Sequence, residues 1–177
     1  MRREVLIATA AVLLIGIGAG AQASPGEASA VLKGASGDIG SVKIHEGRTG
    51  VLLHVEVSGL TPGWRAMHFH AAGDCSDPKF MSSGGHINDP MMKRPHGLLN
   101  IEGPDFGDLP NIYVGADGKG MAEAFSTFVS LTGAGGRPAL LDADGSAVVI
   151  HAGPDDYVTQ PIGGAGARVA CGALKAD

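Results

Sequence analysis

Apolar and polar residues alternate over short segments of this chain, and glycine-rich turns separate the segments. The clearest segment places Val51, Leu53, Val55 and Val57 on one face of an extended backbone, because successive side chains of a strand point to opposite sides. Its other face is mixed in character, as in an antiparallel strand with one solvated side. The same pattern predicts seven strands: Ala28–Lys33, Gly40–His45, Val51–Ser58, Ala66–His70, Gly120–Ser126, Ala147–His151 and Arg168–Ala173.

Turn-forming residues stand between the predicted strands, at Thr61-Pro62-Gly63, Asp117-Gly118 and Asp144-Gly145. Helical periodicity is hard to find beyond the first residues. Many short strands joined by such turns predict an all-β sandwich or barrel. Two glycine-rich polar stretches, 71–111 and 152–167, fit no strand, and long loops within a compact domain are usually functional or disordered.

The first 23 residues have the layout of a secretory signal peptide. Arg2 and Arg3 precede an apolar run from Val5 to Ile17, and Ala21-Gln22-Ala23 forms an A-x-A cleavage site. The apolar run is too short for a stable membrane span, although an uncleaved anchor is the alternative. We therefore expect an exported protein, periplasmic if the source has two membranes, with a single domain over residues 24–177.

Length and charge limit the size of that domain's core and the classes of partner that it could bind. Cleavage after residue 23 leaves 154 residues, enough for one domain with its own core. Of the 13 basic and 18 acidic residues in the whole chain, 11 and 17 remain after Arg2, Arg3 and Glu4 are removed, a formal net charge of −6. This acidic balance argues against nucleic acid or an anionic membrane as the main partner.

Cys75 and Cys171 are the only cysteines of the chain. In an oxidising compartment, a disulfide between them is the default expectation. The link would close a loop over most of the domain, and such links typically stabilise a protein by roughly 2–4 kcal/mol. A redox pair or a thiolate metal site would require a CxxC motif or a local Cys/His cluster, and the sequence has neither. We therefore interpret the pair as structural.

Five of the seven histidines form the most specific chemical signal. His68 and His70 are two residues apart on a predicted strand, so both rings leave the same face and can reach one metal ion. Such a pair binds nothing in most proteins, but His86 and His96 follow in the long loop and His151 ends an apolar strand. The other two histidines lie on strands without ligand-like neighbours and are interpreted as ordinary exposed or packed residues: His45 and His54.

Two aspartates, Asp105 and Asp108, share the long loop with His86 and His96. Imidazole nitrogen and carboxylate oxygen at short spacing form a donor set that suits zinc. Turn formation beside Pro104 is the alternative for the aspartates, and without the histidines it would be the better interpretation.

Seven short motifs carry these residues in a fixed order between about Ala28 and Ala173: Met67-His68-Phe69-His70, Gly73-Asp74-Cys75, Gly84-Gly85-His86, His96-Gly97, Gly107-Asp108-Leu109-Pro110, Val149-Ile150-His151 and Gly166-Ala167-Arg168-Val169-Ala170-Cys171-Gly172. Together they resemble the motifs of the copper/zinc superoxide dismutase family, most closely its exported bacterial branch. Each motif alone is weak, but seven in register are not expected by chance. The match covers nearly all of the chain beyond the signal sequence.

The resemblance implies an eight-stranded Greek-key barrel and an oxidoreductase with copper and zinc as cofactors. The implied reaction converts two superoxide ions and two protons into dioxygen and hydrogen peroxide, as copper is alternately reduced and reoxidised. His86 would bridge the two metals as a shared imidazolate, and in the reduced state it could leave copper and carry a proton.

The resemblance also implies the role of each site residue. The implied copper ligands are His68, His70, His86 and His151. The implied zinc ligands, besides the bridging ring, are His96 and Asp108. Asp155 corresponds to an outer carboxylate that links a copper histidine to a zinc histidine, and Cys75 and Cys171 correspond to the family's disulfide. Arg168 corresponds to the arginine that attracts the anion beside copper, with a surface salt bridge as the alternative.

Asp105 departs from the family pattern, which normally has a third zinc histidine at this position. A histidine Nδ1 and an aspartate oxygen both lie two bonds beyond Cβ, so Asp105 could reach the same metal without a backbone shift. We therefore predict a zinc shell of His86, His96, Asp105 and Asp108. The alternative is that Asp105 turns outward and water completes the shell. Arg65 and Ala66 replace a frequent His-Gly pair, which matters only if residue 66 requires a positive φ.

Two other functions compete with the enzyme. A non-catalytic copper or zinc carrier on the same fold is the first, but the set of Met81, Met91 and Met92 is sparse for a copper(I) carrier. A disulfide-linked adhesion or inhibitor domain without metal is the second, and it leaves the five placed histidines unexplained. Superoxide is the expected substrate, no membrane contact is expected after signal cleavage, and a monomer and a homodimer both remain open.

Overall fold

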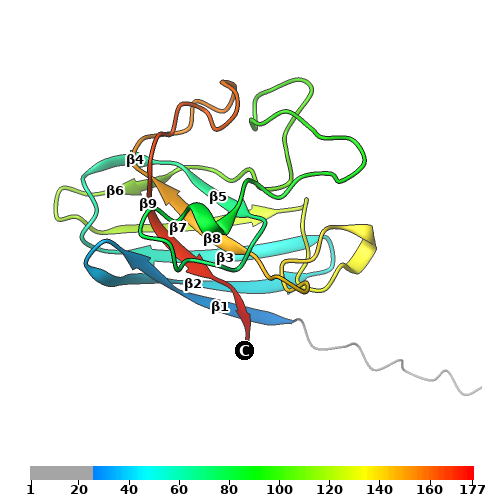
Figure 1. Cartoon of the computed structure of the whole chain (residues 1–177), viewed down its shortest axis with the longest axis horizontal. Helices are drawn as coiled ribbons and strands as arrows, with labels where there is room; N and C mark the ends of the chain where they lie inside the picture. The colour runs from blue at the N-terminus through cyan, green and yellow to red at the C-terminus, as the bar shows by residue number, and fades with distance from the viewer. Residues whose placement is uncertain (1–25) are drawn as a thin grey trace, which may run out of the picture.

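The computed structural model describes residues 26–177, and most of the regular structure in this range is β-strand (Figure 1). The predicted signal peptide lies outside the described residues. Within the described range, no helix is long and apolar enough to cross a membrane. The strands are β1 (Glu27–Gly34), β2 (Gly37–Gly47), β3 (Gly50–Val57), β4 (Gly63–Arg65), β5 (Met67–His70), β6 (Ile112–Val114), β7 (Gly120–Ser126), β8 (Ala147–His151), β9 (Arg168–Ala173) and β10 (Lys175–Ala176). Two short 3-10 turns, η1 (Met81–Ser83) and η2 (Ala134–Gly136), lie in the connections.

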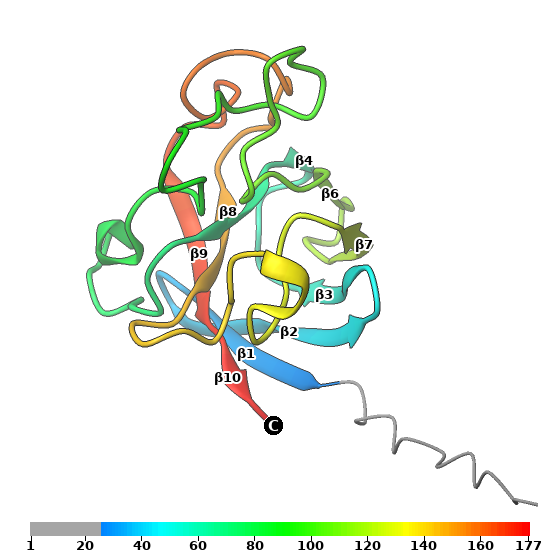
Figure 2. The same ribbon diagram turned by 90° about the vertical axis from the view of Figure 1, so that its right-hand side faces the viewer.

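The strands form one antiparallel sheet that closes on itself (Figure 2). The sheet runs in the order β4-β6-β7-β3-β2-β1-β9-β8-β5, with β10 paired to β1. Its two end strands, β4 and β5, are consecutive in the chain and are separated only by Ala66. The strand β4 pairs with β6, while β5 pairs with β8. The nearly continuous strand formed by β4 and β5 therefore joins the two ends of the sheet and closes the barrel.

The predicted Greek-key barrel is confirmed. With β4 and β5 counted as one strand and the two-residue β10 set aside, the barrel has eight strands. Strands β4, β6 and β7 are neighbours, and β7 then pairs with the earlier strand β3 instead of with β8. A strand that returns beside the first member of such a set defines the Greek-key order.

All seven predicted strands are present, with ends that differ by at most three residues. The alternation in β3 is confirmed, because Val51, Leu53, Val55 and Val57 are buried in the barrel core. Three short strands were missed: β4, β6 and β10. Two or three residues are too few to establish a period of two, and neighbouring strands define these elements through backbone pairing.

Strands β5 and β8 are buried on both faces, unlike β3. Met67, Phe69 and Ile150 point into the hydrophobic core. The alternate residues point outward, where the long loops 71–111 and 152–167 cover them. In Figures 1 and 2, the loop 152–167 (orange) and the later part of the loop 71–111 (green) lie together at the top of the molecule. They bring polar residues from distant parts of the chain over the outer face of β5.

The expected disulfide between Cys75 and Cys171 is present, with the two Cα atoms 5.7 Å apart and a sequence separation of 96. Its sulfur atoms pack with Phe80, Ala147 and Val149 in a small second core outside the barrel. The link ties the first part of the long loop to β9, and this agrees with the structural role expected from the sequence.

Candidate metal centre

The outer face of β5 positions the candidate centre, because His68 and His70 both point away from the core. The loop 86–108 lies alongside this strand and pairs with it at both ends. His86 forms an antiparallel bridge with His70, and Asp108 forms one with His68. Gly107 is required between them, since a side chain there would collide with the backbone carbonyl of residue 69. Backbone pairing therefore places the loop residues beside the strand residues.

Four histidines converge at a first cluster, and each offers one ring nitrogen within 4.8 Å of the others: His68, His70, His86 and His151. The ring centroids of His68 and His86 are 4.1 Å apart, and those of His68 and His151 are 5.0 Å apart. The nitrogens that face inward are His68 Nδ1 and the Nε2 atoms of the other three rings, and none of these buried atoms has a hydrogen-bond partner among residues 26–177. Buried polar atoms normally have partners, so four unpaired nitrogens at one point fit a bound metal ion.

The opposite ring nitrogens of His70 and His151 are fixed by the backbone. The Nδ1 atom of His70 donates to the carbonyl of Gly84 at 2.9 Å, and that of His151 donates to the carbonyl of Gly166 at 3.0 Å. Such outer hydrogen bonds set the tautomer and leave the second nitrogen with a free lone pair. Both rings therefore present Nε2 to the cluster.

Burial keeps three rings of the first cluster neutral, those of His68, His70 and His151. It is the main cause that lowers the pKa of His68 to about 3, of His70 to about 2 and of His151 to about 4, because a charged ring loses its hydration there. The nearby His86 ring lowers all three further. Neutral imidazole is the form that binds a metal, so these rings are ready to act as ligands at pH 7.

A second cluster combines two histidines with two carboxylates, again within 4.8 Å: His86, His96, Asp105 and Asp108. The Nδ1 atom of His86 lies 2.9 Å from Asp105 Oδ2 and 3.7 Å from Asp108 Oδ1, while His96 Nδ1 is in close contact with Asp108 Oδ1. His86 thus offers Nε2 to the first cluster and Nδ1 to the second. The second donor set of imidazole and carboxylate groups fits zinc.

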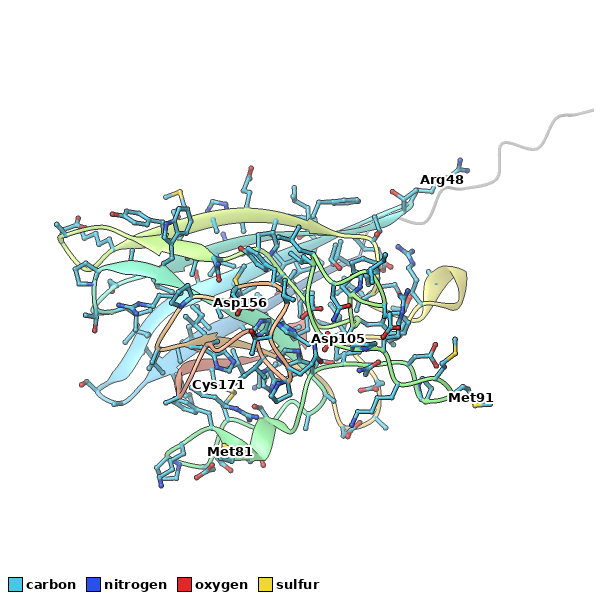
Figure 3. The ribbon with its side chains drawn as sticks, turned by 90° about the horizontal axis from the view of Figure 1, so that it is seen from above. Arg48, Met81, Met91, Asp105, Asp156 and Cys171 are labelled. Carbon is cyan, nitrogen blue, oxygen red and sulfur yellow. A yellow bond between two sulfur atoms is a disulfide. The ribbon has the colours of Figure 1, made fainter. Side chains whose placement is uncertain are left out.

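Each aspartate of the second cluster has one oxygen bound to backbone amides and the other turned toward the histidines. Asp105 Oδ1 accepts from the amide of Gly107 at 2.9 Å, and Asp108 Oδ2 accepts from the amides of Gly97 and Asp105 at 2.7 and 3.0 Å. The turn that was the alternative role of Asp105 is therefore formed, but its second oxygen points inward and its side chain is buried. Figure 3 labels Asp105 within the crowded group of side chains under the loops.

Asp155 connects the two clusters from behind. Its Oδ2 atom lies 2.9 Å from His68 Nε2, and its Oδ1 atom lies 3.1 Å from His96 Nε2. Burial opposes the charge on this carboxylate, but hydrogen bonds from the two rings and the amide of Tyr157 outweigh it and hold its pKa far below the usual range. An alternative donor group of His68, His96, Asp108 and Asp155 also satisfies the distance criterion, but there Asp155 already occupies the Nε2 atoms of both rings.

His96 differs from the other rings because carboxylates stand on both sides of it. Burial alone would lower its pKa, but hydrogen bonds and charge from Asp108 and Asp155 raise the pKa to about 10. Without a metal, the ring is therefore a cation between two anions. A metal ion at this position would take the place of the proton on Nδ1.

Arg168 lies at the edge of the first cluster and is held by the η1 turn. Its Nη1 atom donates to the carbonyl of Phe80 at 2.7 Å and to Ser83 Oγ at 3.0 Å, and its Nη2 atom donates to the carbonyl of Gly84 at 2.7 Å. The same Gly84 carbonyl accepts from His70. Within residues 26–177 the guanidinium forms no ion pair, so the alternative of a surface salt bridge is not observed. Its positive charge stays available beside the histidines.

The remaining sequence assignments fall outside the centre. His45 pairs with Glu27, and His54 lies 3.2 Å from Glu56 on an exposed sheet face, which agrees with their interpretation as ordinary strand residues. Ala66 has no positive φ, since Phe80 and Tyr157 are the non-glycine residues with positive φ in the described range. The change from Gly to Ala therefore introduces no strain.

Arg65, the other departure from the family pattern, donates through its guanidinium to the carbonyls of Thr61, Pro62 and Ala152. It thus holds the turn before β4 against the start of the loop 152–167.

Two amides that sequence analysis missed also hold the loops. Asn111 binds the backbone of Asp155, and Gln160 binds the backbone of His96. A single amide in a polar loop carries no local signal of such a contact.

Comparison with known proteins agrees with this geometry. The family model described as copper/zinc superoxide dismutase matches residues 38–174. The chain is 59% identical over 149 residues to a Caulobacter vibrioides protein named superoxide dismutase [Cu-Zn], a match that covers 84% of this chain and 85% of the relative. It is 44% identical to superoxide dismutase [Cu-Zn] 2 of Aquifex aeolicus, over 77% and 79% of the two chains. The crystal structure of a SOD-like protein from Bacillus subtilis superposes with a TM-score of 0.76 at 38% identity, over 83% of this chain and 97% of that one.

An antiparallel Greek-key barrel with paired histidine and histidine–carboxylate clusters on its outer face defines a metal-dependent oxidoreductase class. The chain belongs to the copper/zinc superoxide dismutase family. Copper and zinc are the cofactors of this family, and its activity is the dismutation of superoxide.

Proposed function

We propose that this chain is an exported superoxide dismutase in which each cluster holds one metal. The copper ligands would be His68, His70, His86 and His151. The zinc ligands would be His86, His96, Asp105 and Asp108. The observation that carries this assignment is the ring of His86, which is nearly buried and offers one nitrogen to each cluster. The unpaired inward nitrogens and the mixed donor set support copper in the first cluster and zinc in the second.

Copper held by His68, His70, His86 and His151 would supply one-electron chemistry, by which one superoxide ion would be oxidised to dioxygen and a second would take up that electron and two protons to form hydrogen peroxide. The protein residues hold the geometry for this exchange. His70 and His151 are locked by backbone carbonyls, and Asp155 fixes His68 and His96 together. His86 Nε2 has no hydrogen-bond partner in the part of the chain that the structure describes, so it can take a proton while Nδ1 keeps the ring in place against the carboxylates.

A superoxide decay assay and metal analysis on purified residues 24–177 test this proposal together. We expect copper and zinc in the protein and a fast decay of superoxide that metal removal abolishes. The competing carrier function predicts bound metal without activity. The structure does not favour a carrier, because Met81, Met91 and Met92 are all exposed, and Met81 and Met91 lie far apart at the margins in Figure 3. The metal-free adhesion domain predicts neither metal nor activity.

Arg168 is proposed to attract the superoxide anion to the first cluster. The domain is acidic overall, so local positive charge must overcome long-range repulsion, and charged clefts can raise association rates by about 10–10³-fold. We expect Arg168→Glu to lower kcat/KM by about 10-fold or more at low ionic strength, with copper and zinc content unchanged. Lys175→Glu, on exposed β10, makes the same change in net charge away from the centre and is the matched control. Equal rates for the two variants would refute a guiding role for Arg168.

Asp105 is proposed as the fourth zinc ligand in place of the usual histidine. Removal of an outer partner of a metal site typically costs roughly 10–100-fold in affinity, and loss of a direct ligand should cost at least that. We therefore expect Asp105→Ala to bind zinc at least about 10-fold more weakly in a competition titration with a chelator. Glu102→Ala removes an exposed carboxylate from the same loop and should leave the affinity unchanged. An Asp105→Ala variant with the affinity of the wild type would show that this side chain does not bind zinc.

Export, the periplasmic location, the single domain over 24–177 and a homodimer remain proposals. The signal-like first 23 residues support export. The exposed ring of Trp64 on β4, which packs edge-on against exposed Tyr113 of β6 at 5.0 Å, supports self-association. Tyrosine and tryptophan are enriched at protein–protein interfaces relative to the rest of the surface. Sedimentation velocity on the purified domain would give the mass directly.

A further inference from the structure

Gln160, in the loop 152–167, holds the backbone of His96 with both ends of its side-chain amide. Its Oε1 atom accepts from the His96 amide at 3.0 Å, and its Nε2 atom donates to the His96 carbonyl at 2.8 Å. The Nε2 atom also donates to the carbonyl of Val158 at 3.0 Å. This pairing reproduces the two-bond contact of facing residues in antiparallel strands, although neither residue lies in a strand. The side chain thus acts as a local substitute for a strand.

The loop 71–111 makes the same kind of two-bond contact with the backbone of the loop 152–167. Asn111, at the end of the loop 71–111, donates through Nδ2 to the Asp155 carbonyl at 2.9 Å and accepts at Oδ1 from the Asp155 amide at 2.9 Å. Asp155 in turn lies 3.1 Å from the His96 ring. Two amides, one from each loop, therefore clamp the backbones of His96, a member of the second cluster, and of Asp155, which lies behind its ring.

His96 depends on this clamp more than the other histidines of the centre do. His68, His70 and His151 lie within strands, and His86 is bridged to His70. In the described part of the chain, His96 belongs to no strand and forms no β-bridge, and Gly97 follows it with a φ of 119°. Its backbone groups are held by side chains: Gln160 binds both, and Asn100 Nδ2 adds a bond to the carbonyl at 3.1 Å.

We propose that Gln160 is a positioning residue for the zinc-side histidine, and that it slows the loss of zinc by fixing the His96 backbone to the loop 152–167. The inference rests on the proposed zinc site. Gln160 touches neither metal nor substrate. It acts through His96, whose Nδ1 atom must stay near Asp108 to remain a ligand. Zinc retention therefore depends on the arrangement of a loop that contributes no zinc ligand of its own.

The test measures zinc loss and the geometry of the zinc site in three variants. Gln160→Met keeps the length of the side chain but removes both hydrogen bonds. Gln160→Glu keeps the acceptor for the His96 amide but sets an anion against its carbonyl. Val158→Ala, an exposed side chain in the same loop, is the matched control, because the hydrogen bond from Gln160 goes to the backbone carbonyl of Val158 and survives the substitution. Each metal-free protein is loaded with zinc or copper, and transfer to a chromophoric chelator is timed. Cobalt(II) in place of zinc reports the site geometry in its visible spectrum.

We expect zinc transfer about 10-fold faster in Gln160→Met, at the low end of the 10–100-fold typical of outer partners because Gln160 is exposed to water. Gln160→Glu should also be faster than the wild type, Val158→Ala should match it, and the cobalt spectrum should change only in the Gln160 variants. Copper transfer should stay unchanged. Unchanged zinc transfer in Gln160→Met, or equal acceleration of zinc and copper loss, overturns the inference. Failure of the wild type to hold cobalt at a histidine–carboxylate site overturns the proposed zinc site itself.

Discussion

Replacing His86 with alanine should reduce superoxide dismutation more than any other single change. The ring offers Nε2 to three other histidines and Nδ1 to two carboxylates, so its loss removes a donor from both clusters at once. It also removes the group proposed to hold a proton beside the first cluster, and positioned proton transfer alone is typically worth about 10²–10⁴-fold in rate. We expect kcat/KM to fall by at least about 100-fold.

Superoxide decay and metal content should be measured on the same His86→Ala sample. Both metals should bind more weakly than in the wild type, because each cluster keeps only three of its donors. His54→Ala removes a half-exposed ring from β3, outside both clusters, and should retain full activity and both metals. If His86→Ala kept its activity, or lost the affinity for only one metal, the shared-ring assignment would be wrong.

Removal of the Cys75–Cys171 disulfide should cause the largest loss of stability. The link spans 96 residues, and the loss of such a cross-link releases chain entropy in the unfolded state. We expect the Cys75→Ser/Cys171→Ser variant to lose roughly 2–4 kcal/mol of unfolding free energy. The measurement is urea denaturation of the metal-free protein, so that metal binding does not contribute to the midpoint.

Reduced wild-type protein is the matched control for the disulfide variant, because it has lost the link but keeps both sulfur atoms. The urea midpoint of the reduced wild type should fall to about that of the double variant. The disulfide also ties the segment that contains η1 to β9, and the guanidinium of Arg168 is bound to that segment. The reduced enzyme should therefore also lose activity at urea concentrations below the midpoint of its unfolding. Identical midpoints for oxidised and reduced protein would contradict a stabilising role.

The sequence predicted the larger part of the barrel because strand periodicity is local. In β3, four alternate apolar residues mark the buried face regardless of what the rest of the chain does. The segment Ala147-Val148-Val149-Ile150 was predicted on the same grounds, although β8 is buried on both faces. The short strands β4 and β6 escaped detection, because three residues show no period and only their pairing partners define them.

The types of residue in the site were also predictable, but their orientation was not. Histidines and aspartates of the right type and order are visible in the sequence, and so is the substitution at Asp105. Which nitrogen each ring presents depends on contacts with distant residues, such as Asp155, which is 87 positions from His68. Whether Asp105 turns inward depends on the Gly107 amide and the His86 ring together.

The fold class, the disulfide pair and the set of candidate ligands could all be predicted from the sequence, because they follow from local alternation, from a count of two cysteines and from the order of the motifs. The folded chain was needed to show that His86 faces two clusters, that Arg168 forms no ion pair within residues 26–177, and that Gln160 holds His96 from 64 positions away. These features come from two loops packed against the same strand, and a contact between segments far apart leaves no mark in the local pattern of either one.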